Sequence, residues 1–190
     1  MNIELKEITV KELTENYQDN AENGVVGLDG KLDIRPPYQR EFVYGEKERQ
    51  AVIDTLTKDF PLNVMYWAVR EDGNFEVIDG QQRLTTLTIL LSSITSNLSG
   101  ELRHDFENYL REPGRASQGL KPKPRLALRE RDREFFAKYI QALDFETLLG
   151  LDPAGLDNES QKNIQMNSRL LLDKLKNVFG NDTDKLCGFG

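Results

Sequence analysis

A strand, a tight turn and a long helix follow one another without interruption between residues 75 and 98. The short apolar run 75–78 ends in Asp79-Gly80, and an apolar pattern with helical period begins directly after it. This order predicts a strand, a turn at Gly80 and a helix over residues 81–98. Apolar residues on more than one side of that helix predict that it is largely buried. A site at the junction would therefore rest on a core strand and a core helix.

The junction carries side chains that suit the binding of an anion. A helix start leaves backbone N–H groups without partners and has a partial positive charge. Arg83 adds a guanidinium close to that end, where the dipole disfavours a cation unless an anion lies beside it. Gly80 would let the backbone come close to a ligand or take up a positive φ. Two interpretations stay open and are compatible: Asp79 and Gln82 form a capping box, or a phosphate-bearing ligand binds here.

Composition bounds the classes of protein to which the chain can belong. It has 190 residues, of which 38% are hydrophobic, and no apolar run is long enough to span a membrane. The first residues show no basic segment followed by an apolar one, and Cys187 is the single cysteine, so we expect a cytoplasmic protein. One cysteine and one histidine, His104, also exclude the usual zinc ligand sets.

Charge is unevenly distributed along the chain. The formal net charge is −7, so the whole molecule gains no long-range attraction to nucleic acid. Residues 115–133, however, hold seven basic and two acidic residues, a local charge of +5. Three interpretations of this stretch stay open: a solvated face, a segment paired with the acidic body of the chain, or a nucleic-acid contact. The candidate contacts are Lys121, Lys123, Arg125, Arg129 and Arg133.

The remaining pattern predicts an α+β fold, with a small mixed sheet and helices followed by an all-helical C-terminal extension. We place a subdomain boundary near residue 100, which gives units at 1–99 and 100–180 and a flexible tail or truncation end at 181–190. Strands are expected at 3–9, 25–34 (a hairpin) and 62–69 (a central strand), and helices at 9–17, 45–60, 101–110, 129–143 and 160–178, with loops at 19–24 and 148–159.

Three segments carry a resemblance to a known family. The run Ile78-Asp79-Gly80-Gln81-Gln82-Arg83-Leu84-Thr85-Thr86-Leu87 resembles, nearly letter for letter, the signature of the GmrSD-type family of bacterial defence proteins. The run Tyr38-Gln39-Arg40-Glu41-Phe42-Val43-Tyr44 is similar to that family's upstream motif, and residues 125–132 are similar to its later arginine-to-aspartate segment. The resemblance covers roughly residues 5–175.

The resemblance implies a ParB- and sulfiredoxin-like nuclease-like fold with a helical extension, and a domain that binds and hydrolyses a nucleoside triphosphate (GTP, ATP, CTP or UTP) with Mg²⁺. Full-length members restrict modified or foreign DNA, usually with an HNH-type nuclease domain or subunit. By motif position, Asp79, Gln82 and Arg83 would be catalytic, and Gly80, Gln81, Gln39 and Arg40 would bind the nucleotide. Arg83 and Arg40 would meet phosphate charge, Asp79 would hold a metal-bound water or cap the helix, and Tyr38 is a further candidate nucleic-acid contact.

Some features limit what the resemblance can imply. An HNH nuclease needs several histidines, so His104 alone argues against that activity in this chain. The sequence also lacks a Gly-Lys-Ser/Thr phosphate loop, so a triphosphatase here would not be of the P-loop type. Tyr38, Gln39 and Arg40 could instead pin their loop to the core. Three functions therefore compete: a nucleotide-hydrolysing regulatory module, a non-catalytic nucleic-acid-binding module, and an interaction domain whose junction only caps a helix.

Overall fold

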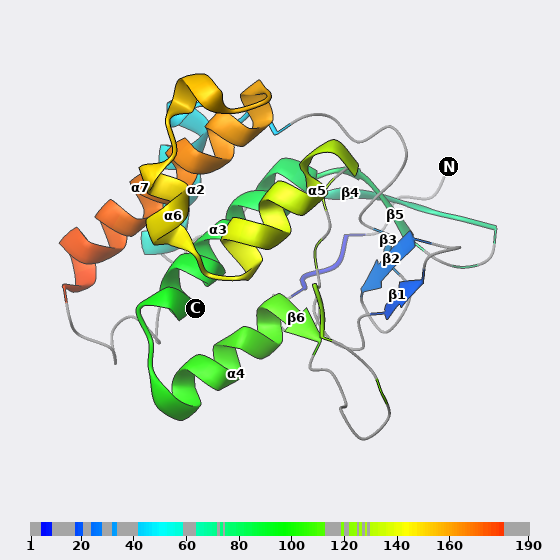
Figure 1. Ribbon diagram of the computed structural model, residues 1–190. Coiled ribbons are helices and arrows are strands. Elements are labelled where there is room, and N and C mark those ends of the chain that lie inside the picture. Colours follow the sequence, from blue (N-terminus) through cyan, green and yellow to red (C-terminus); the bar gives the residue numbers. More distant parts are fainter. Residues whose placement is uncertain are drawn as a thin grey trace.

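A small sheet and a bundle of helices make up the protein, as Figure 1 shows. The computed structural model describes residues 5–8, 18–20, 24–27, 32–33, 42–58, 64–71, 73, 75–112, 119, 122–124, 126, 128 and 130–180. The strands gather at one end of the molecule and the helices pack against one another at the other end. The predicted α+β class is therefore confirmed.

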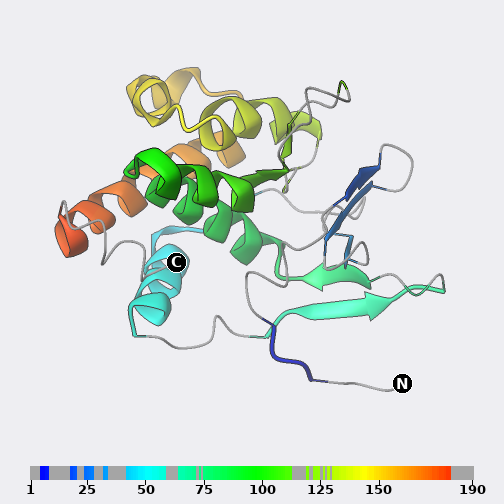
Figure 2. The same ribbon diagram turned by 90° about the horizontal axis from the view of Figure 1, so that it is seen from below.

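The sheet has five strands in the order β1-β2-β3-β5-β4. All neighbouring strands are antiparallel except β3 and β5, which are parallel, so the sheet is mixed as predicted. In Figure 2 the hairpin of β4 and β5 extends away from the helices. The strands are β1 Gln18–Asn20, β2 Gly24–Gly27, β3 Leu32–Asp33, β4 Tyr66–Val69 and β5 Phe75–Asp79, and a separate two-stranded sheet joins β6 Arg111–Glu112 to β7 Lys123–Pro124.

The helices enclose one long central helix, α3, which packs against α2, α4 and α7. They are α2 Glu46–Thr57, α3 Gln81–Ser96, α4 Gly100–Leu110, α5 Glu130–Phe136 with its π-helical continuation η2 Ala137–Gln141, α6 Phe145–Gly150, the 3₁₀ turn η3 Pro153–Gly155 and α7 Glu159–Phe179. The predicted helices at 45–60, 81–98, 101–110, 129–143 and 160–178 match α2, α3, α4, α5 with η2, and α7 in kind and to within a few residues.

Hydrogen bonds within α3 explain how the helix can bury small polar side chains. Leu84, Leu87 and Ile94 are buried on its apolar face, as predicted. Thr85 and Thr86 are buried as well, and their hydroxyls donate to the carbonyl oxygens of Gln81 and Gln82 one turn earlier, both at 2.9 Å. Because a buried hydroxyl needs a partner, this back-bonding lets the helix be enclosed on several sides.

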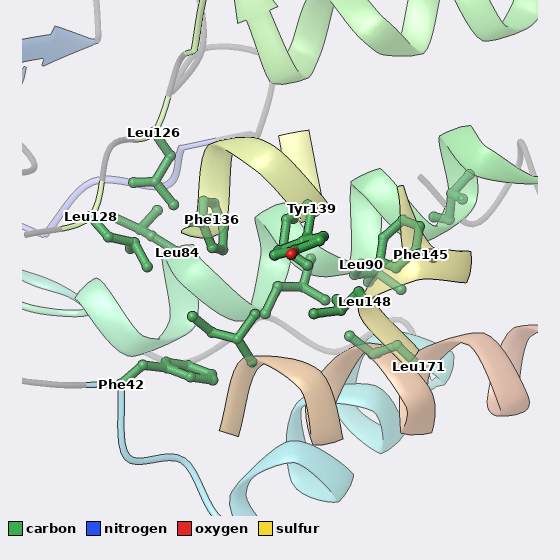
Figure 3. Close-up of a cluster of buried hydrophobic side chains, with 14 of the residues drawn as sticks. Phe42, Leu84, Leu90, Leu126, Leu128, Phe136, Tyr139, Phe145, Leu148 and Leu171 are labelled. Atoms are coloured by element: carbon green, nitrogen blue, oxygen red, sulfur yellow. The ribbon is translucent and has the colours of Figure 1, made fainter. Parts of the chain in front are cut away.

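A single cluster of buried apolar side chains joins the strands to the helices (Figure 3). Val77 of β5 and Phe42 lie in the same cluster as Ile94 of α3 and Leu171 of α7. Its members thus come from both sides of the boundary expected near residue 100. The division into units at 1–99 and 100–180 stays a prediction.

Several expected elements are wrong. The strand at 62–69 is not central, because β4 stands at the end of the strand order and exposes Tyr66 and Val69 by 61% and 67%. Aromatic and β-branched residues favour edge strands as well as central ones, so composition alone misplaced it. Residues 5–8 form no strand, whereas β1 falls partly within the expected loop at 19–24. The helix expected at 9–17 lies outside the described residues.

The second half of the chain also holds an element that the pattern did not predict. Helix α6 starts at Phe145, where the Asp144 carboxylate accepts a hydrogen bond from the backbone N–H of Thr147 at 3.3 Å. Leu148, expected to begin a loop, is fully buried in this helix. A helix of six residues is too short to show a period, so its apolar residues gave no signal.

Candidate functional site

The candidate site lies where β5 ends and α3 begins. Gly80, and not Asp79, is the N-cap of α3, with φ 128° and ψ −5°. The backbone N–H of Leu84 donates to the Gly80 carbonyl oxygen at 3.0 Å and closes the first helical turn. The capping box expected from Asp79 and Gln82 is therefore wrong, because the cap is a residue without a side chain.

A β-bulge sets the direction of the last residues of β5. Tyr66 of β4 is paired with Asp79 and Trp67 with Val77, so Ile78 has no opposite residue. A bulge of this kind twists the strand and re-aims the side chains beyond it. Ile78 and Asp79 are in consequence both exposed, although they are consecutive in a strand.

Gly80 is needed for a close approach, but that approach is to the protein itself. A Cβ atom at this position would lie 2.8 Å from Cγ of Met65, and the φ of +128° is one that L-residues rarely adopt. The positive φ expected as one role of Gly80 is therefore confirmed, and the close neighbour that the structure shows is Met65.

Arg83 forms an ion pair with Asp79 one helical turn earlier. Its Nη2 lies 2.6 Å from Oδ2 of Asp79, and the exposed fractions of the two side chains are 11% and 64%. The chain's own carboxylate thus supplies the negative charge beside Arg83, so a phosphate that binds there has to replace Asp79 and does not enter a vacant site. Nε of Arg83 is buried and has no hydrogen-bond partner in the described part of the chain.

The two glutamines of the junction form hydrogen bonds to backbone groups, one in β5 and one in the upstream motif. Gln81 donates from Nε2 to the Val77 carbonyl oxygen at 2.7 Å, which ties the helix start back to β5. Oε1 of Gln82 accepts a hydrogen bond from the backbone N–H of Val43 at 2.9 Å. The segment that ends the upstream motif is therefore held directly against the first turn of α3.

Tyr44 is brought to the site by that contact. Burial raises the pKa of its phenol, while the charge of Arg83 lowers it and the charges of Asp79 and Glu48 raise it. Its ring also lies 6.2 Å from the ring of Phe42, between centroids. Tyr44 was included in the upstream motif but not among the expected site residues, and Glu48, in the first turn of α2, was not among them either.

The other expected site residues are not brought into this group by the described structure. Tyr38, Gln39, Arg40, Lys121, Arg125 and Arg129 lie outside the described residues, and Lys123 is described only through the backbone of β7. Arg133 is exposed on α5, next to Asp132, a buried carboxylate that accepts a hydrogen bond from Nδ2 of Asn158 at 3.0 Å. His104 is exposed on α4.

No group of three or more His, Cys, Asp or Glu side chains among the described residues is placed to hold a metal ion. None of the helices in the described part of the chain is long and apolar enough to cross a bilayer.

The sequence matches one family model over most of its length. The family is described as GmrSD restriction endonuclease, N-terminal domain, and the match covers residues 10–186. The comparisons with curated proteins and with solved structures gave no match. The expected likeness to the ParB and sulfiredoxin fold therefore stays a prediction.

Proposed function

This chain belongs to the GmrSD restriction endonuclease N-terminal domain family, and from that premise we propose that it binds and hydrolyses a nucleoside triphosphate to regulate DNA cleavage. As a member of this family, it is a component of a restriction, or phage-defence, system. The nuclease that it would regulate is an HNH-type domain or subunit. The proposal includes a cytoplasmic location, where such a system meets incoming DNA.

The observation that carries the proposal is the ion pair of Asp79 and Arg83 at the open end of a buried helix. A triphosphate with its Mg²⁺ presents one negative and one positive group, as this pair does. Phosphate oxygens can replace the carboxylate at Arg83, and the metal can replace the guanidinium at Asp79, without leaving a charge uncompensated. Asp79 is free to move because 64% of its side chain is exposed.

The donor set fits a metal that arrives with the nucleotide. Mg²⁺ keeps several waters and commonly takes one or two carboxylates besides the substrate phosphates, so Asp79 alone is a sufficient protein ligand. Bound there, the metal would neutralise charge on the phosphates. The chain itself would supply the first N–H groups of α3, which the Gly80 cap cannot satisfy, and the guanidinium of Arg83. Gln39 and Arg40 are proposed as further contacts from the upstream motif.

Hydrolysis would require the chain to stabilise the charge that develops on the transferred phosphoryl group. Arg83 is the proposed residue for this task, since a guanidinium binds phosphate oxygens through two parallel hydrogen bonds. Its buried Nε lacks a partner in the described structure, so a donor is available to strengthen such a contact. Asp79 would orient the attacking water through the metal, and Gln82 and Gln81 would hold the loop.

Nucleotide binding can be tested by calorimetry with ATP, GTP, CTP and UTP, each with and without Mg²⁺. Arg83→Met should weaken binding by at least about tenfold, because a charge-assisted hydrogen bond is lost. Arg103→Met is the matched control, since Arg103 also pairs with a carboxylate one turn away, Glu107, but on α4. If none of the four nucleotides binds, or if the two variants behave alike, the proposal fails. Release of phosphate, measured with the same variants, tests hydrolysis.

Contact with DNA is the second proposal, and it rests on the local charge of +5 in residues 115–133 of a chain with net charge −7. Binding of this kind should weaken steeply as salt is raised. Charge reversal at Lys121, Lys123 and Arg125 should abolish it. Equal DNA affinity before and after reversal would remove this proposal and leave nucleotide binding untouched.

A further inference from the structure

One peptide unit next to the candidate site is held from both sides by side-chain amides. The backbone N–H of Val43 donates to Oε1 of Gln82 at 2.9 Å, and Nδ2 of Asn163 donates to the carbonyl oxygen of Phe42 at 3.1 Å. The carbonyl of Phe42 and the N–H of Val43 belong to the same peptide bond. Gln82 lies in the first turn of α3 and Asn163 near the start of α7, so two helices distant in sequence grip one peptide.

The direction of both hydrogen bonds is fixed by chemistry. A backbone N–H can only donate and a carbonyl oxygen can only accept, so Gln82 must present its oxygen and Asn163 its NH₂ group. Residues 42–45 belong to no helix or strand, and their peptide groups therefore need partners outside regular structure. The two amides supply those partners for this one peptide unit.

Side-chain packing adds a third constraint on the same segment. The Phe42 side chain is 3% exposed and lies at one edge of the core cluster, beside α7 (Figure 3). Val43, the next residue, is 57% exposed. The buried ring fixes where the chain leaves the core, and the amides fix how the peptide after it is turned. Tyr44, which follows, is thereby held near enough to the first turn of α3 for the charges of Arg83 and Asp79 to shift its pKa.

We propose that Asn163 and Gln82 form an amide clamp on the Phe42–Val43 peptide, through which α7 positions Tyr44 and the end of the upstream motif against the Asp79–Arg83 pair. Asn163 is in this sense a positioning residue, contributed by the helical extension to a site built on β5 and α3. The clamp is a property of the protein alone. Only its consequence for nucleotide affinity rests on the proposed function.

Hydrogen exchange of the Val43 amide, followed by NMR, tests the clamp without any ligand. Gln82→Met removes the acceptor and should speed exchange by about five- to tenfold, the effect of losing one neutral hydrogen bond. Gln82→Glu keeps an acceptor oxygen and should restore protection. Asn163→Asp removes the donor to Phe42 and should also speed exchange at Val43, although Val43 keeps its own acceptor.

The matched control is Gln165→Glu on the same helix. Nε2 of Gln165 donates to the carbonyl oxygens of Leu148 and Leu151, both at 2.8 Å, so its loss costs at least as much stability as the loss of the Asn163 bond, and does so away from the clamp. This variant should leave exchange at Val43 unchanged. Exchange elsewhere in α3 reports whether each variant is folded.

The consequence for the ligand is tested with Mg·ATP and Mg·GTP as probes. Asn163→Asp should weaken binding by about five- to tenfold, whereas Gln165→Glu should not. Unchanged Val43 exchange in Asn163→Asp, or an equal change in both variants, overturns the clamp. If the unmodified protein binds no nucleotide, the proposed function fails, but the exchange measurements still decide whether the clamp exists.

Discussion

Gly80 is constrained twice, by its own backbone and by the side chain of Met65, the residue before β4. Its φ of +128° is a conformation that L-residues rarely adopt, and Met65 occupies the space where a Cβ atom would lie. The motif glycine thus serves the turn between β5 and α3 before it serves any ligand. Asp79 and Arg83 keep their spacing of one helical turn only while this turn is intact.

We expect Gly80→Ala to lower the free energy of unfolding by about 1–3 kcal/mol, through backbone strain and the contact with Met65. Gly155→Ala is the control, because a Cβ atom there has no neighbour within 4 Å and Gly155 has no positive φ. Urea denaturation measures both variants. Equal stability of the two would show that the turn tolerates a side chain and that the role of Gly80 lies elsewhere.

The pKa of Tyr44 depends on the charges around the site, so its change in a variant reports on them. Burial is the main reason that its pKa lies above 10.0, and Arg83 opposes that shift while Asp79 adds to it. Arg83→Met should therefore raise the pKa of Tyr44 further, and Asp79→Asn should lower it. NMR titration of ¹³C-labelled tyrosine rings, assigned with Tyr44→Phe, measures this, and shifts of the opposite sign would contradict the arrangement.

The sign of the linked pH effect follows from the same shift. The folded protein holds the Tyr44 proton more tightly than the unfolded chain does. The corresponding stability is fully present below pH of about 10, the ordinary tyrosine value, and is lost as the pH rises through the folded-state pKa. Tyr44→Phe should remove this part of the alkaline destabilisation.

At the scale of elements, the sequence predicted what periodicity and length define. The junction of β5 with α3 and the helix α7 both follow long, regular apolar patterns, and both were found where expected. Sequence spacing could not decide between competing partners. Asp79 was equally placed to cap α3 or to pair with Arg83, and only the structure shows that Gly80 caps and Asp79 pairs.

The contact of Asn163 with Phe42 was beyond sequence reasoning for a different reason. The two residues are 121 positions apart, and neither belongs to a pattern that indicates the other. Their meeting depends on how α7 packs against α3, which is set by the whole core. A local pattern therefore identified the motif residues. Asn163, which holds the end of the upstream motif, could be found only from the tertiary packing.

Glu107 joins the end of α4 to the start of β6. It pairs with Arg103 at 3.1 Å and with Arg111. Partial burial raises the pKa of Glu107, but the hydrogen bonds from Arg111 and Arg103 outweigh it and hold that pKa below its usual value. The stability that this pairing contributes is present above the unfolded-state pKa and is lost as the pH falls through the folded-state pKa.

We expect Glu107→Gln to cost about 0.3–1 kcal/mol at neutral pH, because both arginines are well exposed. The cost should vanish in acid, where the wild-type carboxylate is itself protonated. Thermal unfolding at neutral and acidic pH measures the difference. Lys162 and Glu159 form an exposed pair on α7, and Glu159→Gln is the control, with a smaller expected effect.

At the scale of the whole molecule, one core serves both the sheet and the helices. Ile94 of α3 and Leu171 of α7 are buried in the same cluster as Val77 of β5. α3 also packs against both α4 and α7. A chain with this arrangement should unfold as a unit, because neither half can keep its apolar surface buried without the other.

Leu171→Ala tests this expectation, since Leu171 is 1% exposed and belongs to α7. This helix follows residue 100 in the sequence, whereas all five strands of the main sheet precede it. The cavity should lower the free energy of unfolding by about 2–5 kcal/mol. Met166→Ala on the same helix is the control, because Met166 is 53% exposed and its truncation should cost little stability.

Fluorescence of Trp67, the single tryptophan, reports on β4, and far-UV circular dichroism reports chiefly on the helices. Both signals should shift together in urea. If the Trp67 transition stays in place while the dichroism transition moves, the chain consists of two independent units, and α7 cannot position residues at the junction of β5 and α3 in the way that the clamp requires.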